Sequence, residues 1–298
     1  MGPLSTVLTA ILVAVIVAAV WLAGGRHRLH AAALRSRRAV QRVATRYLGD
    51  LGRRGMLWVT RHLGGGALAV LTVGLVTLCG LSALLEYVTD SVQEYDGIAL
   101  VDPPIVAWLA AHREPALTAA MRTLSMVGGP GPATAIAGIA CAGAAWRGRN
   151  WLPVATVAIG LAGFGLAAIV VKLEVARRRP PLPYAVMAVD GYSFPSGHAL
   201  GVTTAMLISA WAVTRWVIRS WNGRIAFWTT TVVFIAGVGF SRVYLGVHYP
   251  SDVIAGWLLG TIWTGAVLTC AEAWDHFRSR SALTSAPQPH EGTERSAP

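Results

Sequence analysis

Charged residues are scarce in this sequence, and lysine is almost absent. Of 298 residues only 13% are charged, and Lys172 is the one lysine among 25 basic residues. Soluble domains carry about 25% charged residues. A chain that is 54% hydrophobic and this poor in charge cannot cover itself with polar surface. The composition therefore argues against a soluble protein and for one surrounded by lipid.

Residues that bind metals or form disulfides are also few. The three cysteines are Cys79, Cys141 and Cys270. Each lies inside an apolar run without metal-ligand spacing, so we interpret them as small core residues. A group of acidic residues comprises Glu86, Asp90, Glu94 and Asp96. Their irregular spacing favours a solvated face over a Mg²⁺ site.

Long apolar runs are abundant. A helix needs about 20 apolar residues to cross a hydrocarbon core of about 30 Å. Seven segments approach this length: Leu4–Ala23, Gly66–Tyr87, Ser125–Trp146, Trp151–Val171, Ala199–Val217, Ile225–Phe240 and Val253–Ala273. Positive charge follows the first run and does not precede it, which favours a retained anchor over a signal peptide.

The runs divide the chain into four parts. We expect an N-terminal transmembrane anchor at 1–25, a basic cytoplasmic amphipathic loop at 26–63, a six-span core at 64–275 and a disordered cytoplasmic tail at 276–298. The predicted fold class is all-α: a polytopic membrane helix bundle with a six-helix core and one extra N-terminal transmembrane helix.

The arginines are distributed unevenly across the predicted bundle. Ten lie in 26–63, and with the turns 146–150 and 215–224 and the tail, 18 of the 25 basic residues fall on one side. Basic loops mark the cytoplasmic side, so we place these residues there. Residues 26–63 either form a basic helix on anionic lipid or act only as a topology signal. No base-reading motif accompanies the charge, which argues against nucleic-acid binding.

The outer segment 88–125 carries one further helical pattern. Four of its residues share a helical face between prolines: Ile105, Trp108, Leu109 and His112. We expect a short interfacial helix here, beside the polar blocks described next.

Three polar blocks interrupt the second half of the chain, and all are predicted on the outer side. Charges this close to a membrane are costly and usually functional. The first block contains Lys172 and, after six intervening residues, Arg179. A lysine offers a phosphate ester a point charge, and an arginine offers a planar fork of donors. We expect Arg177 and Arg178, by contrast, to extend toward the lipid headgroups.

The second block, Pro195-Ser-Gly-His198, leads into the fifth span. Ser196 is a natural N-cap, and the start of a helix presents free N–H groups to an anion. Gly197 lets the backbone approach a phosphate closely. His198 could donate a proton to a leaving oxygen. Alone the tetrapeptide is weak evidence, because Ser-Gly pairs often only begin helices.

The third block joins the sixth and seventh spans and begins with Ser241 and Arg242. Pro250 and Asp252 indicate the start of a helix. Asp252 could accept a hydrogen bond from one imidazole nitrogen of His248 and leave the other as a nucleophile. Arg242 is a further donor to phosphate.

Together the blocks resemble the type 2 phosphatidic acid phosphatase superfamily. Its pattern is Lys, six residues, Arg-Pro; then Pro-Ser-Gly-His; then Ser-Arg, five residues, His, three residues, Asp. All eleven specified positions match: Lys172, Arg179, Pro180, Pro195, Ser196, Gly197, His198, Ser241, Arg242, His248 and Asp252. The resemblance covers roughly residues 64–275 and implies an integral membrane lipid phosphatase.

The resemblance also implies a role for each matching side chain. His248 would attack phosphorus and form a phosphohistidine, Asp252 would orient its imidazole, and His198 would protonate the leaving group. Five residues would bind the phosphoryl oxygens: Lys172, Arg179, Ser196, Gly197 and Arg242. Because these side chains supply the positive charge, no metal and no other cofactor is expected.

The substrate implied is a membrane-embedded lipid phosphate: phosphatidic acid, phosphatidylglycerol phosphate, or a polyprenyl mono- or diphosphate such as undecaprenyl diphosphate. The expected location is a bacterial plasma membrane, with the site on the extracytoplasmic face. No sequence pattern selects one of these lipids or an oligomeric state.

Three alternatives use a similar pocket. A lipid phosphotransferase would pass the phosphoryl group from the same phosphohistidine to a second lipid. Vanadium haloperoxidases share the anion pocket but are soluble. A non-catalytic lipid-binding or scrambling protein would have no physical reason to keep both histidines and all the phosphate cations.

Overall fold

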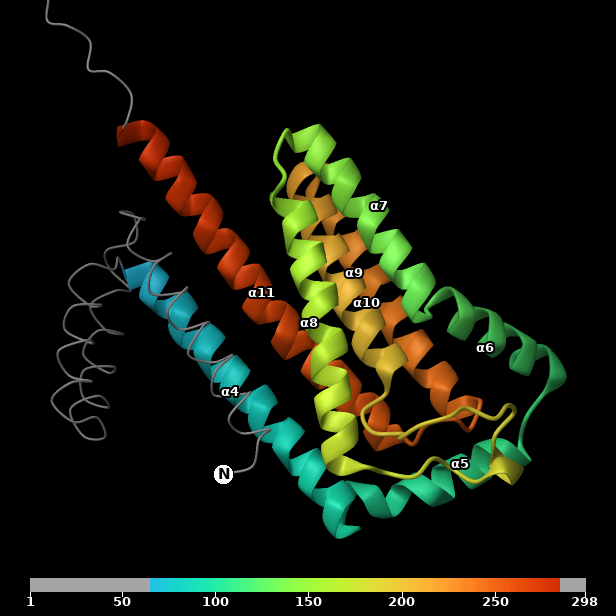
Figure 1. The fold of residues 1–298 in the computed structure, drawn as a ribbon. Coiled ribbons are helices and arrows are strands. Elements are labelled where there is room, and N and C mark those ends of the chain that lie inside the picture. Colours follow the sequence, from blue (N-terminus) through green and yellow to red (C-terminus); the bar gives the residue numbers. More distant parts are fainter. Residues whose placement is uncertain (1–64, 285–298) are drawn as a thin grey trace, which may run out of the picture.

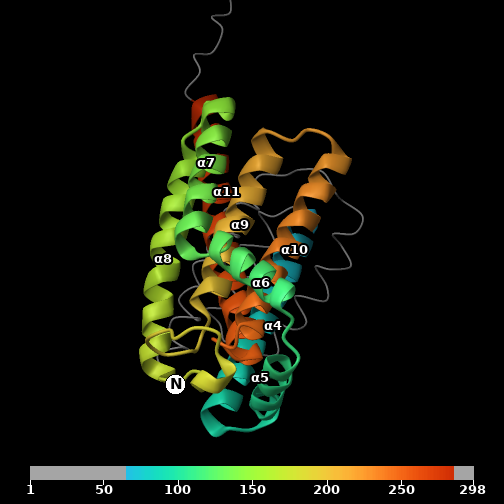
Figure 2. The ribbon, with the colours of Figure 1, turned by 90° about the vertical axis from the view of Figure 1, so that its right-hand side faces the viewer.

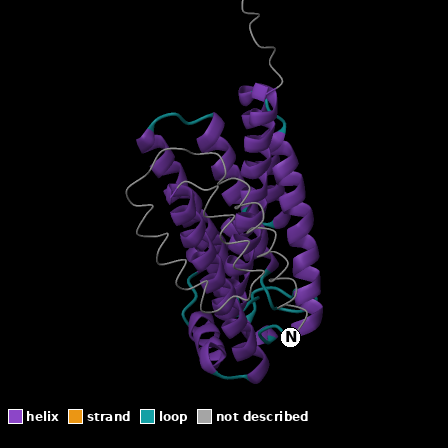
Figure 3. Cartoon of the chain, turned by 90° about the vertical axis from the view of Figure 1, so that its left-hand side faces the viewer, coloured by secondary structure: helices purple, strands orange, loops and turns teal. Residues whose placement is uncertain are grey.

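The computed structural model describes residues 65–284, and every regular element in this part is a helix (Figure 3). The predicted anchor and basic loop lie outside the described residues, as does the tail beyond 284. The elements are α4 (Gly65–Glu94), η1 (Gly97–Val101), α5 (Asp102–Ala111), α6 (Pro115–Val127), α7 (Pro130–Gly148), α8 (Leu152–Val175), η2 (Leu182–Tyr184), α9 (Gly197–Trp216), α10 (Trp221–Tyr244) and α11 (Pro250–Thr284). The all-α class is confirmed.

Four of the described helices are long and apolar enough to cross a membrane: α8, α9, α10 and residues Pro250–Glu272 of α11. The pair α6–α7 makes a fifth span if it is counted as one bent helix. Helix α4 covers the second run predicted from the sequence and continues beyond it to Glu94. The chain is a multi-pass membrane protein.

Two predicted boundaries are wrong. The third run, Ser125–Trp146, is not one straight helix, because α6 and α7 meet at an angle of 53°. Gly128 and Gly129 end α6, and Pro130 opens α7 at a position where its missing N–H costs nothing. The tail was expected to be disordered from 276, yet α11 runs to Thr284. No Pro or Gly interrupts the sequence between 261 and 284 except Gly265, so nothing stops the helix at 276.

Helix α9 is the centre of the bundle. It packs against α7, α8, α10 and α11 (Figures 1 and 2). Of its apolar window 72% is buried inside the protein, against 22% for α10. Small residues of α7 such as Ala133 and Ala137 pack in one core with Val202 and Ala205 of α9. A central helix of this kind can hold the residues at its N-terminus in a fixed place.

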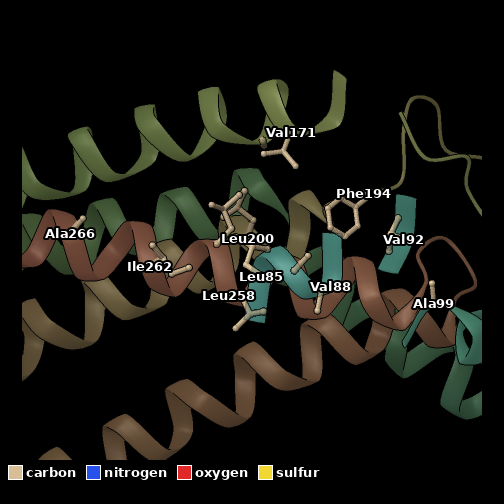
Figure 4. Close-up of a cluster of buried hydrophobic side chains, with 13 residues drawn as sticks. Leu85, Val88, Val92, Ala99, Val171, Phe194, Leu200, Leu258, Ile262 and Ala266 are labelled. Carbon is tan, nitrogen blue, oxygen red and sulfur yellow. The ribbon is translucent and has the colours of Figure 1, made fainter. Parts of the chain in front are cut away.

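A second core lies where α4, α9 and α11 meet (Figure 4). Leu85 and Val88 of α4 pack with Leu200 of α9 and Ile262 of α11. Phe194, which is fully buried, extends this core to the residue before the second polar block. Between helices surrounded by lipid, such packing stabilises through van der Waals contacts, so the second block is attached to a closely packed part of the fold.

The expected interfacial helix is α5. Its inner side carries Asp102 and Val106, both buried, while Ile105 and Trp108 are exposed. The ring of Trp108 stacks on His112 with centroids 4.5 Å apart. The face predicted from the sequence is therefore mostly turned outward, and an acidic residue lies on the buried side.

Candidate active site

The three polar blocks meet at one end of the bundle, although they are far apart in the sequence. The segment 176–196 between α8 and α9 lies beside α5 at this end (Figure 1). Residues 245–249 connect α10 to α11 there. Val186 N–H donates to the carbonyl of Leu245 at 3.0 Å and so joins the two connections.

The start of α9 is fixed to α11. Ser196 caps α9, because its Oγ accepts the N–H of Ala199 at 3.5 Å. The Ser196 N–H donates to the carbonyl of Asp252 at 2.9 Å. Gly256 allows this approach, since a Cβ there would lie 2.8 Å from the Ser196 carbonyl oxygen. One backbone bond thus links the second block to the third.

Gly197 begins α9 beside open space. A Cβ at this position would meet no atom within 4 Å. The first N–H groups of a helix have no partner within the helix, and they carry the positive end of its dipole. An anion could therefore approach the backbone here, as the sequence predicts.

His248 lies between a carboxylate and a cation, and it is only 2% exposed. Its Nδ1 is 3.4 Å from Oδ2 of Asp252, and its Nε2 is 3.2 Å from Nη1 of Arg179. A guanidinium can only donate, so Nε2 is the acceptor and the proton of the neutral ring is on Nδ1. In this tautomer the lone pair of Nε2 points toward Arg179.

The protonation state of His248 follows from its surroundings. Burial lowers the pKa of His248 to about 4, although the hydrogen bond and the charge of Asp252 raise it; Arg179 and Arg242 lower it further. The imidazole is therefore neutral at neutral pH. A neutral ring is the form that can act as a nucleophile.

Arg179 holds the segment before α9 against the His248 connection. Its Nη1 donates to the carbonyl of Val247 at 2.8 Å, and its Nε donates to that of Gly191 at 3.0 Å. Its Nη2 donates to Tyr192 O at 3.2 Å. Burial lowers the pKa of Arg179, while Asp252 and Asp190 raise it, and a guanidinium stays charged throughout.

Lys172 lies next to Arg179. Its Nζ donates to the same carbonyl of Tyr192 at 2.7 Å. The amine of Lys172 keeps two further N–H groups for a stronger acceptor such as a phosphate oxygen, whereas the N–H groups of Arg179 are directed at backbone carbonyls and at His248. The structure therefore brings these two predicted phosphate-binding residues together.

Arg242 approaches from α10 and is 5% exposed. Its Nη1 donates to Oγ of Ser125 at 2.6 Å. Its Nε is buried without a hydrogen-bond partner among the described residues. Such a donor is costly to leave unpaired and suits an incoming anion. Ser125 was not identified from the sequence as a site residue; a lone polar side chain at the edge of an apolar run was its only signal.

His198 lies in the first turn of α9, close to the break between α6 and α7. A Cβ at Gly129 would be 3.5 Å from its Nε2. Arg242, His248 and Arg179 are near enough to interact with it electrostatically. Within residues 65–284 neither ring nitrogen has a hydrogen-bond partner, so both are available to a ligand.

Arg177 is where the sequence-based interpretation was wrong. It was expected at the headgroups, yet it is only 8% exposed. Its Nη1 lies 2.7 Å from Asp252 and its Nη2 lies 2.7 Å from Asp102. Burial disfavours its charge, but Asp252 and Asp102 outweigh this and raise the pKa of Arg177. Only Arg178 is exposed as expected.

Comparison with a solved structure defines the class of fold. The chain is similar to the first transmembrane PAP2 type phosphatidylglycerolphosphate phosphatase from Bacillus subtilis, with a TM-score of 0.57 and 23% sequence identity. The match covers 68% of this chain and 96% of the other. The bundle therefore has the fold of a transmembrane PAP2-type protein.

The sequence of the same region matches a family model. Residues 153–275 match the model of the PAP2 superfamily, which confirms the resemblance noted above. All three polar blocks lie within the match.

Curated relatives are similar in sequence to parts of this chain. An undecaprenyl-diphosphatase of Sulfolobus acidocaldarius is 43% identical over 70 residues, which are 24% of this chain and 29% of the relative. A decaprenylphosphoryl-5-phosphoribose phosphatase of Mycobacterium tuberculosis is 35% identical over 128 residues, 41% of this chain and 61% of the relative. Phosphatidylglycerophosphatase B of Bacillus subtilis is 32% identical over 94 residues, 31% of this chain and 45% of the relative. The chain spans less than two thirds of the length of each.

Proposed function

We propose that this chain is an integral membrane lipid phosphatase that hydrolyses a phosphomonoester or diphosphate of a lipid through a phosphohistidine at His248. The observation that carries the proposal is the neutral, buried imidazole of His248. Asp252 lies at its Nδ1, and Nε2 is directed toward Arg179. A nucleophilic nitrogen beside cations is the arrangement that attack on an anionic phosphorus requires.

In the first step, Nε2 of His248 attacks phosphorus, an N–P bond forms, and the bond to the leaving oxygen breaks. Asp252 stabilises the positive charge that develops on the ring. His198, protonated when the anionic phosphate is bound beside it, gives its proton to the leaving oxygen, so the lipid departs as an alcohol or, from a diphosphate, as a monophosphate.

In the second step, water attacks the phosphohistidine. His198, now neutral, takes a proton from the water, and the N–P bond breaks to release orthophosphate and restore His248. The phosphoryl oxygens are bound throughout by the side chains of Lys172, Arg179 and Arg242, by the hydroxyl of Ser196 and by the backbone N–H of Gly197. Among residues 65–284 no group of three or more His, Cys, Asp or Glu is placed to hold a metal, and the proposed mechanism uses none.

The substrate class is supported by the names of the relatives. Undecaprenyl diphosphate, phosphatidylglycerol phosphate and decaprenylphosphoryl-5-phosphoribose each carry a phosphate on a lipid. Phosphatidic acid belongs to the same chemical class. The proposed location is a bacterial plasma membrane. The proposed position of the site on the outer face is supported by the arginine-rich segments predicted on the opposite side.

The test is phosphate release by the detergent-purified protein, with excess chelator, across a panel of these lipids. We expect release from at least one lipid and none from His248→Ala. His112→Ala is the matched control, because His112 is exposed and lies outside the site, and it should retain full activity. When a reaction with phosphate-labelled lipid is quenched, the protein should carry a labelled phosphoryl adduct that is acid-labile and alkali-stable. This adduct should be absent from His248→Ala.

Three results would contradict the proposal. Equal activity in His248→Ala and wild type would exclude the histidine as nucleophile. Transfer of labelled phosphoryl to an acceptor lipid without orthophosphate release would identify a phosphotransferase. No turnover of any lipid would favour a binding protein.

A further inference from the structure

Arg177 is the centre of a buried network that includes four other polar groups. Its Nη1 donates to Oδ1 of Asp252 and to Oγ of Ser251, each at 2.7 Å. Its Nη2 donates to Oδ2 of Asp102 at 2.7 Å. The guanidinium also lies over the ring of Tyr249, 4.3 Å from its centroid. Both aspartates are fully buried.

Asp102 connects this network to a different helix. It opens α5, and its Oδ1 accepts the backbone N–H of Ser251 at 3.1 Å, while its Oδ2 accepts the hydroxyl of Ser251. A carboxylate from α5 thus caps the first turn of α11, which is the turn that carries Asp252. Buried charges of this kind are stable only when every partner is in place.

The network determines which oxygen of Asp252 faces the histidine. Arg177 occupies Oδ1. The other oxygen, Oδ2, accepts the N–H of Tyr249 at 2.9 Å and lies 3.4 Å from Nδ1 of His248. Without Arg177 the carboxylate could rotate about its Cβ–Cγ bond, and a second buried carboxylate, Asp102, would repel it.

We propose that Arg177 and Asp102 are positioning residues that hold Asp252 in the orientation needed to fix the tautomer of His248. The effect that we expect this role to have on turnover rests on the proposed function. Arg177 does not bind phosphate, because its two terminal nitrogens are engaged by carboxylates and Tyr249 covers one face of the guanidinium. It acts on the reaction only through Asp252.

The experiment compares Arg177→Gln, Arg177→Lys, Asp102→Asn and the double variant Asp102→Asn/Arg177→Gln, with Arg178→Gln as the matched control. Arg178 is the exposed neighbour and should behave as wild type. Arg177→Gln should lose roughly 10- to 100-fold in kcat with KM changed less than about twofold, as for the loss of other groups that orient a reacting residue. Arg177→Lys should recover part of kcat, because it keeps the charge but not the fork.

The double variant separates positioning from a general loss of structure. Arg177→Gln leaves two buried carboxylates facing each other, and Asp102→Asn removes one of them. We therefore expect the double variant to turn over faster than Arg177→Gln. A double variant as slow as Arg177→Gln or slower would overturn the proposal, as would a rise in KM at constant kcat.

Binding of inorganic vanadate gives a readout that needs no substrate. Vanadate is a phosphate-like anion that can bond to Nε2 of His248, and calorimetry gives both its affinity and the fraction of competent sites. We expect affinity to fall about tenfold in Arg177→Gln and to recover in the double variant. If wild type releases no phosphate but this order of affinities holds, the proposed function fails and the positioning role stands. If vanadate binds wild type and Arg177→Gln equally, the positioning role fails.

Discussion

Gly197 is a residue at which the fold tolerates a side chain that the proposed chemistry does not. A Cβ there would meet no atom within 4 Å, and alanine is a better helix former than glycine. The same open space is where we propose that phosphate meets the start of α9. One methyl group added at residue 197 can therefore test the proposed phosphate contact without disturbing the fold.

Gly197→Ala should keep or slightly raise the midpoint of thermal unfolding and lower kcat/KM by at least about tenfold, because the methyl group occupies phosphate-binding space. Gly138→Ala, at an equally open position inside α7, is the control: it should also keep or raise the midpoint but leave kcat/KM unchanged. Unfolding scans and phosphate release measure both. Unchanged activity in Gly197→Ala would place the phosphate elsewhere.

The low pKa of His248 predicts how the stability of the protein changes with pH. Its folded pKa of about 4 lies below the value of about 6.5 in an unfolded chain. The unfolded state therefore takes up the proton first as pH falls, so the stabilisation is complete above about pH 6.5 and is lost as pH falls toward 4. His248→Gln should show a weaker loss of thermal stability over this window than wild type. Parallel curves for the two proteins would contradict the low pKa.

Catalysis should follow the same ionisation. After correction for ionisation of the substrate, kcat/KM should hold down to about pH 5 and fall near pH 4, where Nε2 becomes protonated. If kcat/KM instead falls near pH 6.5 because His248 becomes protonated there, the imidazole is solvated in the working protein.

The residues of the site were largely predictable, but their charge partners were not. Lys172, Arg179 and Arg242 were identified because they stand at fixed spacings in local blocks. Arg177 and Asp102 are 75 positions apart, and no local pattern signals a pair that forms only when α5 packs against the start of α11. A buried arginine and one at the headgroups look the same in sequence.

At the scale of elements, α9 and α11 are held together closely at the site. The Ser196 N–H reaches the Asp252 carbonyl at 2.9 Å because Gly256 has no side chain. A Cβ at Gly256 would lie 2.8 Å from the Ser196 carbonyl oxygen and 2.9 Å from Cβ of Ala199. These neighbours are backbone or the first side-chain atom, so they cannot move aside as a flexible side chain would.

Gly256→Ala should therefore destabilise the protein by about 1–3 kcal/mol and reduce kcat, because it separates the second block from Asp252. Gly265→Ala is the control on the same helix, since its Cβ would meet only Cδ2 of Leu78, at 3.7 Å. Denaturation and turnover of both variants check this. Full activity in Gly256→Ala would show that the two blocks do not need this close contact.

Helices were easier to predict than their breaks. The apolar runs gave the positions of α8, α9 and α10 because lipid requires continuous hydrophobicity. The bend between α6 and α7 was missed, although Gly128 and Gly129 mark it, because a hydropathy pattern does not register backbone geometry. A Cβ at Gly128 would lie 2.2 Å from Cγ2 of Val238, so the break also depends on a contact with α10 that is distant in sequence.

At the scale of the whole molecule, the polar blocks lie at one end of the bundle and the short turns at 149–151 and 217–220 lie at the other (Figure 2). These turns carry Arg149 and Arg219, while the arginines at the site end lie mostly in or beside the polar blocks. This separation is what the positive-inside rule predicts if the site faces outward.

Sidedness can be measured in intact cells with a membrane-impermeant maleimide. Leu182→Cys, in the segment before α9, should be labelled, because Leu182 is 68% exposed at the site end. Arg219→Cys, in the exposed turn at the opposite end, should be labelled only after the cells are opened, and the unsubstituted chain gives the background. The reverse pattern would place the site in the cytoplasm.

The single lysine has a practical consequence for chemical biology. Lys172 is the one lysine in the sequence, and its amine lies beside Arg179 at the centre of the candidate site. Apart from the amino terminus, an amine-reactive reagent therefore has one target in the chain. The same side chain that we propose binds phosphate would then serve as a built-in attachment point, and protection from labelling would report occupancy of the site without any assay of turnover.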